Sequence, residues 1–223
     1  MCGTGLVEIW NSSGTTTGKA SLWGLDLTLQ QRWGARMMGD RDEKVAIGTY
    51  VSQDVRKPSD PITVEMKDRS VLRKSEWNKL IKPRLLPPPA HYRQVCKFER
   101  GHKKMVIWEA VAPSPHYLAL SMLATATEDM PGGGDMCCVP SSWCVESDMR
   151  LKVWEDEEGR GLYIINSLGL LAASSKPYMP PAGPFYDIKK ELRTGHKFAL
   201  GHPVNAGILY QAAGTSRSLG TTF

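Results

Sequence analysis

Residues 14–21, which read GTTTGKAS, are the segment of the chain most like a phosphate-binding loop. In such a loop, backbone amides and a lysine hold the phosphates of a nucleotide. The motif needs four residues between its glycines and a serine or threonine directly after the lysine. Here three residues separate Gly14 from Gly18, and Ala20 follows Lys19. No helix is expected to begin at this point either, so we interpret the segment as a hairpin loop.

The cysteine and histidine residues lack the spacing of a metal site or of an activated nucleophile. Zinc sites need spaced thiolate pairs, whereas Cys137 and Cys138 are adjacent and would point to opposite faces of a strand. We expect Cys138 in the core and Cys137 at the surface or an edge. Because no nucleophile has a positioned base and orienting acid, the sequence predicts a protein that is not an enzyme, with no metal, cofactor or small-molecule substrate. The other residues of these types are Cys2, Cys96, Cys144, His91, His102, His116, His196 and His202.

Positive charge is concentrated in the middle of the chain. The formal net charge is +5, but residues 67–104 carry twelve Lys or Arg against three acids, a local excess of +9 that leaves −4 for the rest. An anionic leaflet attracts a cationic segment by about 1 kcal/mol per Lys or Arg near its surface. We therefore expect this basic belt, residues 67–104, to dock on an anionic membrane surface or on other protein subunits. A solvated charged face is the plainer alternative.

The candidate docking residues form two groups within the basic belt. One group lies on an expected helix, together with a tryptophan placed to insert beside it, and the other lies in and around a tight loop after Phe98. The candidates are Arg73, Lys74, Trp77, Lys79, Lys97, Arg100, Lys103 and Lys104, with His102 beside them. Cations mixed with aromatic residues also suit nucleic acid. A sequence pI of about 8.9 and the lack of a known nucleic-acid module leave that partner possible but disfavoured.

The composition predicts a folded chain built from short segments. It has 223 residues, 41% of them hydrophobic and 23% charged, which is ordinary for a globular protein. All-β domains often use this length as a single unit. Fifteen prolines and 21 glycines leave little room for long helices. The sequence has no basic-then-apolar leader, and its apolar runs fall short of the about 18 residues of a membrane span. We therefore expect a cytoplasmic protein with reduced cysteines that can associate peripherally with a membrane.

Alternating apolar residues predict short strands along most of the chain, because strand side chains point in turn to two faces. One helix is expected over Ser70–Lys82, capped by Ser70 and stopped by Pro83. Residues 29–43 are expected to form an irregular connection. The expected strands and hairpins are 6–28 (hairpin), 45–52, 62–66, 92–98, 105–112, 117–125, 136–139, 151–154 with 161–174 (hairpin), and 185–192.

Internal repetition gives the strongest indication of the fold. Val45 reaches Pro58, and Leu118 reaches Pro131, after the same 13 steps and through the same order of small, bulky and hydroxylated residues. Residues 7–23 echo residues 151–165, and Ile107-Trp108 begins a third such unit. Repeats of this kind cannot bury their apolar faces singly, so we expect three similar sheets around one core. The expected core residues are Trp10, Trp23, Val51, Trp108, Leu120, Trp154, Ile164 and Leu170.

Part of the chain resembles the tryptophan-, proline- and glycine-rich β-prism-like repeats of vacuolar protein sorting-associated proteins. The match covers residues 105–192 well, with residues 7–68 as a weaker copy. It rests on Trp108 to Leu120, Pro131, Cys138-Val139-Pro140, and Val153-Trp154 to Asn166-Ser167-Leu168-Gly169. The resemblance implies a non-catalytic module that docks on membranes or partner proteins in intracellular trafficking.

Three residues depart from the repeat. Ala110 stands in place of its usual proline, and His116 and Ser121 stand in place of glycines, although Gly48 keeps the glycine in the weaker copy. These changes affect the turns rather than the β-character, so a surface function tied to the turns does not transfer with the resemblance.

The predicted fold is all-β: a three-sheet β-prism-like domain of degenerate repeats, with one inserted short helix or extended connector. The domain spans residues 1–193. Within it, residues 6–68 form the weaker repeat unit, residues 69–104 the basic connector and residues 105–192 the better-matched units. Residues 194–223 form a Gly/Ser/Thr-rich tail.

The predicted function is a non-catalytic intracellular binding module that docks on anionic membranes or partner proteins in vesicular trafficking. The alternative is a structural subunit of a large cytoplasmic assembly, whose basic belt and tail contact neighbouring chains. A carbohydrate-binding prism is a third class. It is disfavoured because no cluster of acidic and aromatic residues stands out in a turn of the sequence.

Overall fold

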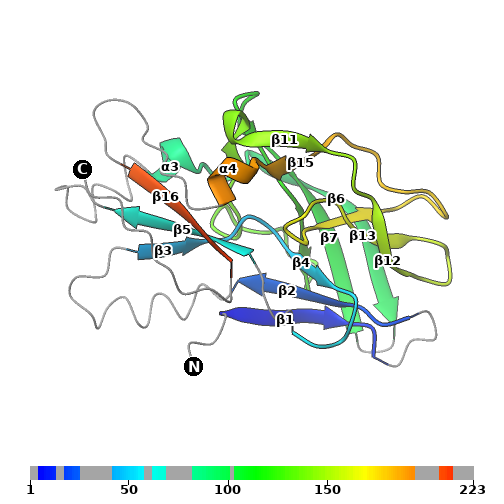
Figure 1. Ribbon diagram of the computed structural model, residues 1–223. Helices are drawn as coiled ribbons and strands as arrows, with labels where there is room; N and C mark the ends of the chain where they lie inside the picture. Colours follow the sequence, from blue (N-terminus) through cyan, green and yellow to red (C-terminus); the bar gives the residue numbers. More distant parts are fainter. Residues whose placement is uncertain are drawn as a thin grey trace.

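The computed structural model describes residues 5–13, 18–25, 42–57, 62–68, 82–100, 103–193 and 206–212 (Figure 1). These residues form mostly antiparallel strands with two short α-helices, which confirms the predicted all-β class. In chain order the elements are β1 (Leu6–Asn11), β2 (Ser21–Leu25), β3 (Asp42–Val45), β4 (Tyr50–Ser52), β5 (Ile62–Asp68), α3 (Lys82–Leu85), β6 (His91–Arg100), β7 (Lys103–Val111), β8 (Tyr117–Leu118), β9 (Met122–Thr125), β10 (Val139–Pro140), the 3-10 turn η2 (Ser141–Trp143), β11 (Cys144–Ser147), β12 (Leu151–Glu155), β13 (Gly161–Ile164), β14 (Leu171–Ser174), β15 (Phe185–Ile188), α4 (Lys190–Arg193) and β16 (Ala206–Ala212).

Three of the sheets are built in the same way. Each is a hairpin followed by a third antiparallel strand, in the orders β1-β2-β4, β6-β7-β9 and β12-β13-β14. The first strand of each hairpin skips one residue in its pairing, at Ile9, Val95 and Val153. Such a bulge bends the strand and re-aims the residue that follows it. The residues that follow, Trp10, Cys96 and Trp154, are all buried in the same hydrophobic cluster.

That cluster is the shared core of the three sheets. Leu22, Ile107 and Leu162 occupy matching positions on the second strands, and each is fully buried. A second cluster contains Trp23, Leu120 and Leu170, and a third is built around Trp108. All the expected core residues are therefore buried except Ile164, which is half-buried against the shared core.

The remaining sheets are smaller or lie to one side. Strands β16, β5 and β3 form a three-stranded sheet, and β10-β8 and β11-β15 are two-stranded. Figure 1 shows the β16-β5-β3 sheet on the side of the molecule opposite the hairpin ends of β12 and β13. Strand β16 lies within residues 194–223, which the sequence predicts to be a Gly/Ser/Thr-rich tail without a regular element.

Two expected strands are broken in the same way. Residues 45–52 divide into β3 and β4, which belong to different sheets, and residues 117–125 divide into β8 and β9. The first break falls at Gly48, whose φ of 137° interrupts an extended strand, and the second falls at Ser121. The prediction of single strands was wrong because alternation alone does not reveal a change of sheet.

The helix prediction also needs correction. Residues 70–81 lie outside the described part of the chain, but Pro83, expected to stop the helix, lies inside the short helix α3 (Lys82–Leu85). Proline is tolerated there because the first-turn N–H groups have no intrahelical acceptor. Leu85 and Leu86 then enter the second core cluster. At the other end, the expected strand 185–192 stops at Ile188 and α4 follows.

Candidate functional site

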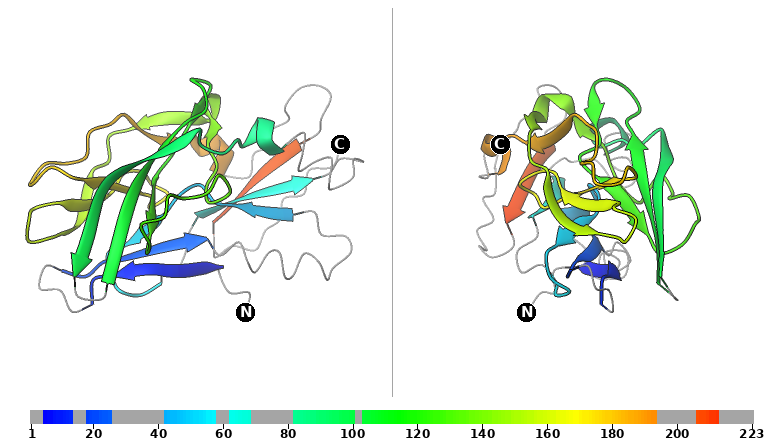
Figure 2. Two further views of the ribbon diagram at one scale, coloured as in Figure 1. Left: turned by 180° about the vertical axis from the view of Figure 1, so that it is seen from behind. Right: turned by 90° about the vertical axis from the view of Figure 1, so that its right-hand side faces the viewer.

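The ends of the β1–β2, β6–β7 and β12–β13 hairpins lie on the same side of the molecule (Figure 2). A cavity lies between them. Its volume is about 190 Å³. The lining comes from the end of β1, from both strands of the β6–β7 hairpin, and from β12 with the turn that follows it. The lining residues are Trp10, Phe98, Glu99, Lys103, Trp154, Asp156, Glu157, Glu158 and Arg160.

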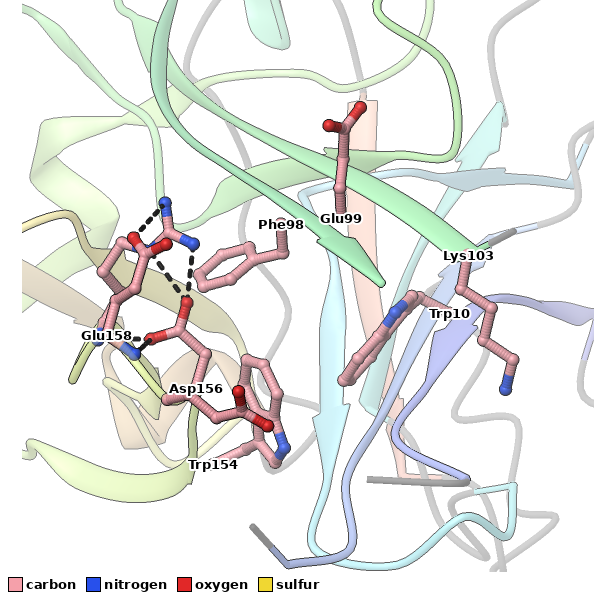
Figure 3. A pocket seen from close by; sticks show the side chains of 9 residues that line it. Trp10, Phe98, Glu99, Lys103, Trp154, Asp156 and Glu158 are labelled. Atoms are coloured by element: carbon pink, nitrogen blue, oxygen red, sulfur yellow. Dashed lines mark hydrogen bonds and ion pairs between the residues drawn. The ribbon is translucent and has the colours of Figure 1, made fainter. Parts of the chain in front are cut away.

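Three aromatic side chains form the apolar part of the cavity (Figure 3). The ring of Trp154 packs edge-to-face against Trp10, with centroids 5.1 Å apart, and against Phe98 at 5.5 Å. Edge-to-face packing is favourable because the positive edge of one ring meets the negative face of another. The β-bulges at Ile9 and Val153 bring both tryptophans to this position.

The turn after β12 is held by a ring of polar contacts. The Asp156 carboxylate accepts hydrogen bonds from the backbone N–H groups of Glu158 and Arg160, at 3.1 and 2.8 Å, and from the Arg160 Nε at 2.8 Å. Arg160 also pairs with Glu158 at 3.3 Å and lies 5.0 Å from the Phe98 ring centroid. The guanidinium is thus fixed between two carboxylates and an aromatic face.

Lys103 ties the β6–β7 hairpin to the β1–β2 hairpin. Its Nζ donates to Asn11 Oδ1 at 2.6 Å and to Ser13 Oγ at 2.7 Å. Because both acceptors lie in or just after β1, this contact holds two walls of the cavity together.

Lys97 and Lys104 share two carboxylates beside the cavity. Glu99 lies 2.7 Å from Lys97 and 3.5 Å from Lys104, and Glu128 lies 2.6 Å from Lys97 and also pairs with Lys104. Hydrogen bonding from Lys97, together with the charges of both lysines, lowers the pKa of the Glu99 carboxyl. All four side chains are partly exposed, so each pair contributes little to stability.

The predicted docking residues fall partly within this region. Lys97, Lys103 and Lys104 lie together at the end of the β6–β7 hairpin, and Arg100 is the last residue of β6. Arg73, Lys74, Trp77, Lys79 and His102, and the side chain of Arg100, lie outside the described residues.

The expectation that acidic and aromatic residues do not cluster at a turn is wrong. The cavity gathers Trp10, Phe98 and Trp154 beside Glu99 and residues 156–158. Part of this cluster can be recognised in the sequence, because Trp154 is followed directly by the acidic turn EDEEGR. Trp10 and Phe98 are distant in sequence, and their proximity to Trp154 depends on how the three sheets assemble.

The described thiols are poorly suited to nucleophilic chemistry. Burial raises the pKa of Cys96, Cys138 and Cys144 to about 12 in each case, so these thiols stay protonated at neutral pH. Cys138 is fully buried, as predicted, and Cys137, which was predicted at the surface or an edge, is half-buried. Within the described ranges, no group of three or more His, Cys, Asp and Glu side chains is arranged to hold a metal ion. None of the helices seen there is long and apolar enough to cross a membrane.

Comparison with known proteins places the chain in a fold class and no further. No protein-family model matches it, and no curated protein matches it in sequence. The chain resembles a solved structure, the crystal structure of GNIP1Aa from Chromobacterium piscinae, with a TM-score of 0.55 and 16% sequence identity. The similarity covers 83% of this chain and 36% of that one, so the chain corresponds to about a third of the length of GNIP1Aa. The likeness is one of fold alone.

Proposed function

We propose that the chain is a non-catalytic binding module that docks on an anionic membrane surface through the end of the β6–β7 hairpin. The observation that carries this proposal is the gathering of Lys97, Lys103 and Lys104 at one exposed hairpin end, with Arg100 closing β6. Cationic side chains presented together attract anionic headgroups more effectively than the same charges spread over a surface.

The ion pairs set the strength of this docking. Within the β6–β7 hairpin end and the segment after β9, four cations stand against the two acids Glu99 and Glu128, which leaves a net +2. The cations are Lys97, Arg100, Lys103 and Lys104. At about 1 kcal/mol per charge, the hairpin end contributes about 2 kcal/mol, or about a 30-fold preference for an anionic surface. Docking through this end is therefore weak and reversible, and the remainder of the basic belt or a partner protein must strengthen it.

A β-prism is the arrangement we propose for the three like-built sheets. Each contributes one face, and the shared core of Trp10, Leu22, Ile107, Leu162 and Trp154 fills the interior. The resemblance to vacuolar sorting repeats belongs to the same proposal and implies a role at cytoplasmic membrane surfaces. Its support is the common strand order and the common bulge position in the three hairpins.

Vesicle flotation tests the docking surface. We expect the protein to float with vesicles that contain phosphatidylserine and to remain in solution with phosphatidylcholine alone. The quadruple variant K97E/R100E/K103E/K104E should lose flotation because the hairpin end becomes acidic. The matched control K57E/K176E/K189E/K190E changes the net charge equally outside the basic belt and should keep most of the binding. Equal flotation of the two variants would reject the hairpin end as the docking surface.

The alternative, a subunit of a larger assembly, draws on one observation. Val145, Met149 and Leu151 lie within seven residues of one another and are 52%, 40% and 46% exposed. Exposed apolar residues that gather in one region often mark a protein-binding surface. Co-purification of a partner that V145S/L151S abolishes, with no flotation on anionic vesicles, would favour this function over membrane docking.

A further inference from the structure

We propose that the cavity between the three hairpin ends binds one ring of a neutral saccharide. The first support is the composition of its walls. Trp10, Phe98 and Trp154 give an apolar side on which the C–H face of a sugar packs, and carboxylates, a lysine and an arginine surround it (Figure 3). Sugar hydroxyls both donate and accept hydrogen bonds, so they need a lining that offers both kinds of partner.

The charge balance argues against an anionic ligand. The lining has four carboxylates and two cations, a net −2. Glu99 points away from the rings and pairs with Lys97 and Lys104 (Figure 3). Without it, Asp156, Glu157 and Glu158 still outnumber Lys103 and Arg160. Both cations already have partners: Lys103 holds Asn11 and Ser13, and Arg160 holds Asp156 and Glu158. A phosphate inside the cavity would meet an excess of carboxylates, whereas a hydroxyl group carries no charge to repel.

One wall of the cavity contains a buried donor that lacks an acceptor. Trp154 is 5% exposed, and its Nε1–H has no hydrogen-bond partner among the described residues. Buried donors without partners are rare and costly, so the Trp154 N–H needs an explanation. The N–H is covered by neighbouring side chains, so a sugar hydroxyl accepts from it only after one of them moves aside.

The size of the cavity limits the ligand. Sites for drug-sized molecules occupy roughly 300–1,000 Å³, and this cavity is smaller, at about 190 Å³. It therefore accommodates a single ring, with any further sugar units outside. The contacts of Lys103 and Asp156 fix two of the walls before a ligand binds, so only the side chains that cover the Trp154 N–H must rearrange.

Saturation-transfer NMR with free glucose, galactose, mannose and N-acetylglucosamine tests the proposal. We expect transfer to at least one sugar and a change in tryptophan fluorescence, because Trp10 and Trp154 line the site. E157Q should weaken binding about tenfold through loss of a charge-assisted hydrogen bond. W154F, which keeps an aromatic ring but removes the N–H, should also weaken it. E146Q, an exposed change on β11 outside the cavity, should bind like the unchanged protein.

Three results would overturn the proposal. They are no transfer to any of the four sugars, equal binding by E157Q, W154F and E146Q, or binding of choline in place of sugars. The thermal unfolding midpoint of W154F shows whether that variant folds. E157Q tests the same site without a change in the core, so its result stands even where W154F does not fold. Vesicles with and without a glycolipid distinguish a lipid-borne sugar from a free one. Because E157Q leaves the hairpin lysines in place, its flotation with anionic vesicles reports on the proposed docking independently.

Discussion

At the scale of single residues, Gly48 and Ser121 decide where the repeat units meet. A Cβ on Gly48 would lie 2.1 Å from the Ser121 Cβ, and the φ of Gly48 is 137°. Ser121 Oγ donates to the backbone oxygen of Met122 at 2.7 Å and contacts that of Leu171 at 3.2 Å. The backbone N–H of Thr49 lies 3.3 Å from the same hydroxyl. This one side chain therefore joins the starts of β4, β9 and β14.

Gly48→Ala should destabilise the protein by about 2–5 kcal/mol, the sum of a strained backbone and a packing clash. Chemical denaturation measures the change in the free energy of unfolding. Gly169→Ala is the matched control, because its φ is 76° and nothing lies within 4 Å of the added Cβ. It should show the backbone cost alone. Adding Ser121→Gly to Gly48→Ala should recover part of the loss, and strict additivity of the two changes would contradict the clash.

Residue types alone predicted this contact only in part. The sequence comparison aligns Gly48 with Ser121 as equivalent positions in two copies, and both prove to lie at strand breaks. That the two equivalent residues touch each other does not follow from the alignment. The contact depends on how the two copies pack against each other in the folded protein, and the order of residues along the chain does not show that arrangement.

At the scale of elements, the segment after β9 controls the charge of the β6–β7 hairpin. Glu128 lies in this segment and pairs with both Lys97 and Lys104. The sequence places Glu128 24 residues after Lys104, so the basic belt appears uncompensated there. Pairing of β9 with β7 brings the segment alongside the hairpin and lowers its effective charge.

Glu128→Gln should therefore strengthen binding to anionic vesicles. Removal of one carboxylate raises the hairpin end from a net +2 to +3, which adds about 1 kcal/mol, or about fivefold in affinity. Co-sedimentation with phosphatidylserine vesicles at low salt measures the effect, and salt should reduce it because the pairs are exposed. Glu146→Gln makes the same charge change on β11. A gain of the same size in both variants would mean that net charge, rather than the hairpin end, sets the affinity.

The strands themselves were largely predictable, and their limits were not. Period-two alternation located β5, β6, β7 and the β12–β13 hairpin. In β6 the alternation reflects one face in the core and one in solvent, whereas β7 is buried on both faces from Met105 to Trp108. The same alternation continued across Gly48 and Ser121, where the chain changes sheet. The bulges at Ile9, Val95 and Val153 were also hidden, since a β-branched residue fits a regular strand and a bulge equally well.

At the scale of the whole molecule, the three like-built sheets depend on one another. The shared core takes Leu22 from the first sheet, Ile107 from the second and Leu162 from the third, all fully buried. Backbone hydrogen bonds also cross between units, from Val51 to Gly169 at 2.9 Å and from Leu171 to Thr49 at 2.9 Å. The same assembly creates the cavity, because each hairpin contributes one wall to it.

This dependence predicts that two sheets without the third do not fold. A fragment of residues 82–193 keeps β6 to β15 but lacks Trp10, Leu22 and Val51, so it exposes the apolar faces of Ile107 and Leu162. We expect poor dispersion in its ¹H–¹⁵N NMR spectrum and strong binding of a hydrophobic dye. Mixing it with residues 1–68 should restore dispersion, because that fragment returns β1, β2 and β4. A dispersed spectrum and cooperative unfolding of residues 82–193 alone would show that the first sheet is an addition to an independent core.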